Sequence, residues 1–201
     1  MLPDYFRRPE SLTITKLDQR EIGAFRIALE DLLNTIPQGP IIDCFTGACG
    51  LYLYPDDLRK RVIGVDSSSF QLRELRSQLL TTETYSPKII EAYCDNLPFV
   101  NESAAAAVAV RGVRYLNWAE NRSFTAEAQR ILRPDGLLVI LDYPTVDLDG
   151  AFDLPDIRNL EKIYFDPTKW GEMARELGFR DIVALYNYLP EMRINLVTAR
   201  K

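Results

Sequence analysis

Two aspartates and two glycines are the residues of this sequence whose spacing first indicates chemistry. Asp43 ends a short apolar segment, Gly47 and Gly50 follow it, and Asp66 ends the next apolar segment 23 positions later. A loop of small residues lets the backbone approach a ligand closely, and a carboxylate about 20 residues further on typically accepts hydrogen bonds from ribose hydroxyls. The pattern predicts a site for a nucleoside-bearing cofactor. Two structural alternatives stay open: the glycines only form a turn, and Asp66 only caps the following helix.

Alternating apolar and amphipathic segments must position these residues. Such alternation is typical of a parallel sheet with helices on both faces. We expect strands at residues 41–44, 61–65, 88–93, 104–110 and 137–142. We expect helices at residues 18–35, 51–61 (interrupted at Pro55), 67–80 or 69–80, 124–132, 153–164 and 167–177. A tight connection at Pro190 predicts a terminal antiparallel hairpin of residues 182–189 and 192–199. The predicted fold class is α/β: a doubly wound, mostly parallel seven-stranded sheet with a C-terminal antiparallel hairpin.

The length of 201 residues predicts a single domain. Within it we expect an N-terminal lid and helix at residues 1–36 and the sheet-bearing core at residues 37–201. The composition, 47% hydrophobic and 26% charged, is that of an ordinary soluble protein. The irregular stretch at residues 144–154 is the best candidate for a functional loop.

Composition also excludes several classes of function. The net charge of -5 disfavours binding to nucleic acid, which needs a clustered basic face. The chain has no histidine, so histidine zinc sites and Ser-His-Asp triads are excluded, and we predict no metal site. Its three cysteines, an odd number, favour a reducing compartment and predict a cytoplasmic protein. The apolar runs are too short to span a membrane. The sequence leaves the oligomeric state undefined.

Four segments, in chain order, resemble the class I methyltransferases that use S-adenosylmethionine, and best their small-molecule, type 11-like branch. The segments are residues 41–50, 62–66, 95–99 and 132–140. The resemblance covers residues 41–143 and implies a Rossmann-like fold, S-adenosylmethionine as cofactor and a small molecule as substrate. The residues that it assigns to cofactor binding are Asp43, Phe45, Thr46, Gly47, Gly50, Asp66, Ser67, Asp95, Asn96 and Arg111.

The first segment, residues 41–50, is a degenerate form of the family's first motif, and the loop with Tyr93 and Asp95 also departs from the family's pattern. Phe45 and Cys49 stand where the family has the first and third of its alternating glycines. Tyr93 replaces the acid that contacts the adenine amine, and Asp95 takes over that contact only if its loop is shifted. The run of alanines at residues 104–107 replaces a Phe-Asp pair that is common in relatives.

Methyl transfer from a sulfonium is an in-line displacement, so the protein must align donor and acceptor and exclude water. Tyr115 takes the position at which relatives often carry a histidine, and it is our candidate catalytic residue. A phenol is a poor base at neutral pH, so a packing role is the alternative. Arg111 is expected to pair with a carboxylate of cofactor or substrate, with a surface ion pair as its alternative. Tyr5, Phe6 and Tyr143 are expected to offer aromatic surface to the acceptor.

Two functions from different classes follow. The first is methyl transfer to a small, apolar or aromatic acceptor. The second is a protein of the same fold that binds a ligand without transferring methyl groups, which the departures at Phe45, Cys49 and Tyr93 motivate. A dinucleotide cofactor competes with both, but Pro55 and the bulky residues 51–53 leave little room for a pyrophosphate at the start of a helix.

Overall fold

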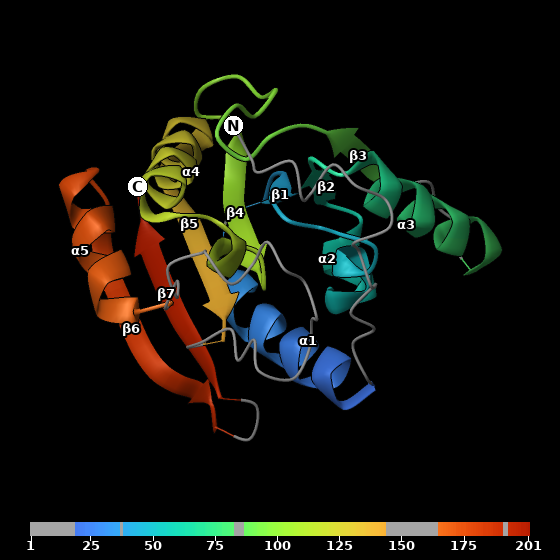
Figure 1. Cartoon of the computed structure of the whole chain (residues 1–201), viewed down its shortest axis with the longest axis horizontal. Coiled ribbons are helices and arrows are strands. Elements are labelled where there is room, and N and C mark those ends of the chain that lie inside the picture. Colours follow the sequence, from blue (N-terminus) through green and yellow to red (C-terminus); the bar gives the residue numbers. More distant parts are fainter. Residues whose placement is uncertain (1–18, 37, 83–86, 144–164, 191–192) are drawn as a thin grey trace, which may run out of the picture.

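The sheet of this protein has seven strands in the order β3-β2-β1-β4-β5-β7-β6 (Figure 1). The computed structural model describes residues 19–36, 38–82, 87–143, 165–190 and 193–201. The first five strands run parallel, and β7 lies antiparallel between β5 and β6. This arrangement is the predicted α/β fold with its C-terminal hairpin. The strands are β1 (Ile41–Asp43), β2 (Val62–Asp66), β3 (Lys88–Glu91), β4 (Ala104–Val110), β5 (Leu132–Asp142), β6 (Arg180–Leu189) and β7 (Ile194–Arg200).

Helices cover both faces of the sheet. Strand residues alternate between the faces, so that Leu138 and Ile140 of β5 pack toward one helical layer, and Val139 and Leu141 pack toward the other. Phe124 belongs to the first layer, which is formed by α4 (Trp118–Ile131) and α5 (Pro167–Glu176). The second layer consists of α1 (Gln19–Leu33), α2 (Asp56–Arg59) and α3 (Ser69–Thr82), with the short 3₁₀ helix η3 (Gly50–Leu53). A further 3₁₀ turn, η4 (Val113–Tyr115), follows β4.

The helix predicted at residues 51–61 is interrupted at Pro55, as expected, because proline removes a backbone donor and ends η3 before α2 begins. Helix α4 starts six residues earlier than predicted. Asn117 accepts a hydrogen bond from the Glu120 backbone N–H, and the Glu120 carboxylate accepts one from the Asn117 backbone N–H. This capping box fixes the helix start. The cap of α3 is Ser68, whose hydroxyl accepts from the Gln71 backbone N–H, and not one of the two neighbouring serines.

Two strands also differ in length from the prediction. β5 begins at Leu132, five residues early, because Ala104 pairs with Leu132 before a bulge restores the main register at Ala106 and Leu137. β3 ends at Glu91, two residues early. The expected helix at residues 153–164, the loop at residues 144–154 and the aromatic pair Tyr5-Phe6 lie outside the described residues.

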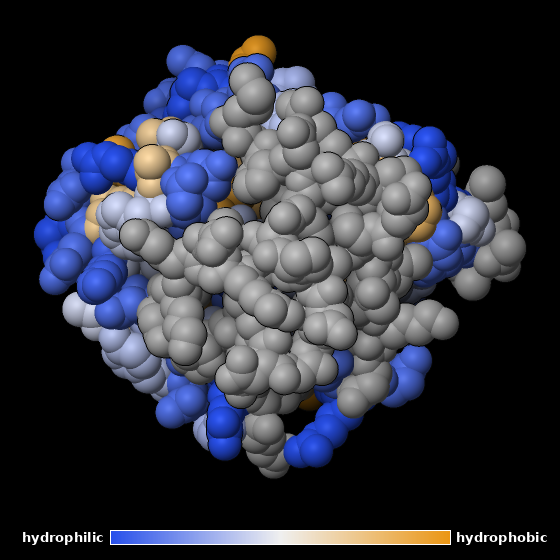
Figure 2. All heavy atoms as spheres, in the orientation of Figure 1, coloured by the Kyte–Doolittle hydropathy of each residue, from blue (hydrophilic) through white to orange (hydrophobic). Residues whose placement is uncertain are grey.

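The described surface in Figure 2 is mainly hydrophilic, with small apolar patches. No helix within the described ranges combines the length and the apolar character that crossing a membrane requires. The edge strand β6 exposes the apolar side chains of Val183 and Leu185, and its register with β7 is irregular on either side of them. Bulges and irregular register are a usual means of discouraging pairing at a sheet edge.

Candidate functional site

The loops after β1, β2 and β4 meet at the carboxyl edge of the sheet, where β1 lies between β2 and β4. Strands β2 and β3 lie on one side of β1, and β4 and β5 lie on the other. The strand order therefore reverses between β1 and β4. The first loop is tied to both neighbours, because the Cys44 N–H donates to the Val108 carbonyl and the Thr46 N–H donates to the Val65 carbonyl. Ligands of doubly wound sheets bind at this switch point.

Asp66 joins the first loop to the end of β2. One of its carboxylate oxygens accepts a hydrogen bond from the Gly47 N–H at 2.9 Å, and the other accepts one from the Ser68 N–H at 2.9 Å. Gly47 has a φ of +51°, a conformation that favours glycine. Burial raises the pKa of Asp66, and the backbone donors, including that of the adjacent Ser67, oppose the shift. Each carboxylate oxygen keeps a second lone pair, so this structural role leaves acceptors for a ribose.

Asp43 lies fully buried beneath the same loop, with the hydroxyls of Thr46 and Tyr54 as neighbours. A side chain at Gly50 would bring its Cβ to 2.7 Å from Asp43 Oδ2 and 2.8 Å from Thr46 Oγ1. In this structure Gly50 therefore makes room for these buried groups. Asp43 Oδ2, Thr46 Oγ1 and the Tyr54 hydroxyl lack hydrogen-bond partners. The predicted contacts of Asp43, Thr46 and Gly50 with cofactor remain predictions.

Burial, with a smaller contribution from the charge of Asp66, raises the pKa of Asp43 to about 7, although the Phe45 backbone N–H lowers it. The folded state therefore holds a proton that the unfolded chain, with a carboxyl pKa of 3.8, has released between those pH values. Stability falls as pH rises through this window. We expect Asp43→Asn, which cannot ionise, to gain about 2 kcal/mol over the wild type between pH 5 and pH 8. Urea unfolding of both proteins at the two pH values measures this gain, and parallel pH profiles would contradict it.

Phe45 bridges the loops that follow β1 and β4. Its ring packs edge-on against Phe124 of α4, with centroids 5.2 Å apart. On the other side it covers Gly112, where a Cβ would lie 2.1 Å from Phe45 Cγ. The bulky residue in the usual glycine position is thus matched by a glycine in the facing loop. Cys49, at the other altered position, is partly buried, and its pKa is raised by burial.

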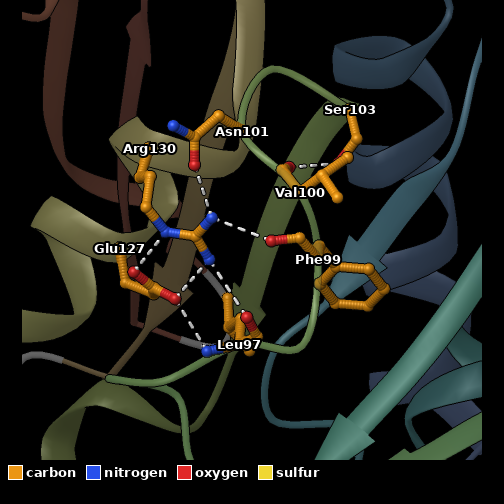
Figure 3. Close-up of polar contacts among 7 residues, drawn as sticks. All are labelled: Leu97, Phe99, Val100, Asn101, Ser103, Glu127 and Arg130. Carbon is orange, nitrogen blue, oxygen red and sulfur yellow. Dashed lines mark hydrogen bonds and ion pairs between the residues drawn. The ribbon is translucent and has the colours of Figure 1, made fainter.

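Two residues of α4 form hydrogen bonds with the backbone of the loop that carries Asp95 and Asn96. Glu127 accepts a hydrogen bond from the Leu97 N–H at 2.8 Å, and Arg130 donates to the carbonyls of Leu97 and Phe99. Figure 3 shows how the Arg130 guanidinium lies among these acceptors and the Asn101 side chain. Its ion pair with Glu127 lowers the pKa of the Glu127 carboxyl. The network fixes the loop and leaves the side chains of Tyr93, Asp95 and Asn96 exposed.

Charged and aromatic side chains gather where β4 and β5 end. The fully buried Asp142 accepts a hydrogen bond from the Arg114 backbone N–H at 3.2 Å, and its carboxylate lies 3.7 Å from Arg114 Nε. Arg114 also donates to the Tyr115 hydroxyl at 2.9 Å. Tyr143 donates to Glu21 of α1 at 2.7 Å. Burial and this hydrogen bond raise the pKa of Tyr143 to about 12.

Sequence reasoning missed Asp142, Arg114 and Glu21 as members of this site. For Asp142 a signal was available, because it ends an apolar strand at the ligand edge, as Asp43 and Asp66 do. Tyr115 and Arg111, which were predicted, lie beside this cluster. Within the described ranges, no group of three or more acidic residues and cysteines could hold a metal ion.

Residues 41–136 match the family model described as a methyltransferase domain. The chain is 32% identical over 124 residues to a ubiquinone/menaquinone biosynthesis C-methyltransferase of Syntrophotalea carbinolica, covering 59% of this chain and 50% of that relative. It spans half or less of the length of the curated relatives that it matches.

Solved structures share the fold. A protein of Pyrococcus horikoshii superposes with a TM-score of 0.70 at 17% identity and covers 98% of both chains. A phosphoethanolamine N-methyltransferase 2 of Haemonchus contortus, crystallised with S-adenosyl-L-methionine, superposes with a TM-score of 0.70 at 14% identity, over 98% of this chain and 60% of that one. At these identities the likeness establishes the Rossmann-like fold.

Proposed function

We propose that this protein transfers a methyl group from S-adenosylmethionine to a small-molecule acceptor, since residues 41–136 match the family model described as a methyltransferase domain. The observation that carries the proposal is the convergence of three loops at the β1/β4 switch point, with the Asp66 carboxylate between two of them. The C-methyltransferase relative and the N-methyltransferase fold neighbour support the same reaction class.

The residues present fit this cofactor at both of its ends. Asp66 keeps lone pairs for ribose hydroxyls, and Asp95 and Asn96 are exposed on the loop that would meet the base. Arg111 Nε, buried without a partner, suits a carboxylate. When bound, the sulfonium supplies an electrophilic methyl group. The chain's part is to orient the acceptor and exclude water. In this proposal Tyr115, held by Arg114, positions the acceptor.

Ligand binding is the first test. S-Adenosylhomocysteine at 100 times its dissociation constant should stabilise the protein by about 2.7 kcal/mol, a rise in melting temperature of roughly 5–11 °C. Asp66→Ala and Asp66→Asn should lose most of this rise, because the ribose hydroxyls lose a charged acceptor. Asp57→Ala, an exposed acid of α2, is the matched control and should keep the rise. A wild type without any rise would contradict cofactor use.

The second test separates transfer from binding. Incubation with S-adenosylmethionine labelled in its methyl group and a panel of apolar and aromatic acceptors should give labelled product. A thermal rise without labelled product favours the second function, a ligand-binding protein of this fold, which the side chains of Phe45 and Cys49 in glycine positions motivate. The absence of nucleic-acid partners and a cytoplasmic location remain predictions from composition.

A further inference from the structure

Two guanidinium groups meet at the amino edge of the sheet, the edge opposite the loops that follow β1, β2 and β4. Arg61 directly precedes β2, and Arg133 lies at the beginning of β5. Both contact Gly39, which lies just before β1. Arg61 Nε donates a hydrogen bond to the Gly39 carbonyl at 3.0 Å, and a Cβ at Gly39 would lie 3.1 Å from Arg133 Nη1. Because these parallel strands begin at the same edge, the fold brings two positive charges together from distant parts of the chain.

The charge of Arg133 is not matched by an acid among the described residues. Its Nη2 is buried and has no hydrogen-bond partner. At the same edge Arg180 forms an ion pair with Asp135, whereas none of the described ion pairs includes Arg133. Burial and the charge of Arg133 lower the pKa of Arg61, and the charge of Asp57 opposes this shift only in part. A buried charged donor without an acceptor is costly, and like charges at short range repel each other. An anion held by both guanidiniums would relieve both costs.

The chemistry of the pair selects the class of anion. A guanidinium presents its N–H donors in a planar fork that matches the oxygens of a carboxylate or a phosphate. The two guanidiniums carry two positive charges, and a phosphate monoester carries about 1.5 to 2 negative charges at pH 7. A phosphate group therefore matches the charge of the pair better than a carboxylate does.

We propose that Arg133 and Arg61 bind a phosphate group at the amino edge of the sheet, either as inorganic phosphate or as part of a small phosphate monoester. The site lies at the end of the strands opposite Asp43 and Asp66, which end β1 and β2. It is therefore separate from the cofactor edge, and the inference does not depend on the proposed function.

Calorimetry at constant ionic strength tests the site and separates the two sources of phosphate. The full chain is titrated with inorganic phosphate in one arm and with glycerol 3-phosphate in the other, with sodium chloride as the blank. The wild type should bind at least one of the two saturably, with one site per chain. Equal affinities in both arms would identify the inorganic ion as sufficient, and tighter binding of glycerol 3-phosphate would identify a monoester as the ligand.

Substitutions locate the binding. Arg133→Met should weaken it about tenfold to a hundredfold, the range of a charged hydrogen bond. Arg133→Lys, which keeps the charge without the fork, should bind with intermediate affinity. Asp57→Ala removes the acid that acts on Arg61 and should tighten binding. Arg122→Met, which removes an exposed ion pair with Glu176, is the control and should bind as the wild type does.

Thermal melting provides a second readout. Phosphate should raise the melting temperature of the wild type and leave that of Arg133→Met unchanged. A wild type that binds neither ligand would overturn the inference, and so would an Arg133→Met variant that binds them as tightly as the wild type. Neither result bears on the proposed function, which the binding of S-adenosylhomocysteine tests separately.

Discussion

Replacing Gly112 with alanine should destabilise this protein by about 3 kcal/mol, at the upper end of the cost of overpacking. The added Cβ would lie 2.1 Å from Phe45 Cγ and 2.4 Å from Phe45 Cβ. Rotating the ring does not relieve a clash with the root of the side chain, so the two loops must separate. Because these loops flank the switch point, Gly112→Ala should also weaken cofactor binding. Urea unfolding gives the loss of stability, and calorimetry gives the loss of affinity.

Phe45→Gly offers the matching rescue. Alone it should be costly, since the ring leaves its contact with Phe124. Combined with Gly112→Ala it should restore part of the loss, with a coupling energy above about 1 kcal/mol in a double-mutant cycle. Gly23→Ala is the matched control, because a Cβ there meets nothing within 4 Å and alanine favours the helix by about 1 kcal/mol. Additive effects of the two loop substitutions would contradict the steric account.

The fold could be predicted because its signals are local. Apolar strands, breakers and amphipathic helices follow one another in the sequence, and their alternation allows few topologies. The start of α4 was misplaced although Asn117 and Glu120 stand at the spacing of a capping box. The start of β5 at Leu132 was missed for a different reason. Its pairing with Ala104 depends on a bulge, and the hydrophobic periodicity of the sequence does not indicate a bulge.

The site could be predicted only in part. Asp66 and Gly47 are 19 positions apart yet hydrogen-bonded, and the spacing of motifs suggested their proximity. The contact of Phe45 with Gly112 and the link from Tyr143 to Glu21 join residues far apart in the chain. Such pairs depend on how the elements pack, and a single sequence carries no direct signal for them. Sequence reasoning therefore found the loops of the site and missed the contacts between them.

The buried pair of Asp142 and Arg114 should show the largest effect of a single substitution. The Asp142 side chain is fully buried and that of Arg114 is 10% exposed. Asp142→Ala removes the carboxylate that faces Arg114 and Arg111, and it leaves the Arg114 charge buried without its counter-ion. We expect a loss of about 3–5 kcal/mol in urea unfolding at pH 7. Glu176→Ala breaks the exposed ion pair with Arg122 and, as the control, should cost less than about 1 kcal/mol.

Removing both charges of the pair should be tolerated much better. Burial raises the pKa of Asp142 although Arg114 and two backbone N–H groups lower it, whereas the charge of Asp142 helps to raise the pKa of Arg114 above its usual value. Desolvation and attraction therefore oppose each other within the pair. A pair with this balance contributes little net stability. We therefore expect Asp142→Leu combined with Arg114→Met to recover most of the stability lost in Asp142→Ala. If the double variant is as unstable as Asp142→Ala, the pair itself stabilises the fold, and desolvation does not dominate at this end of β5.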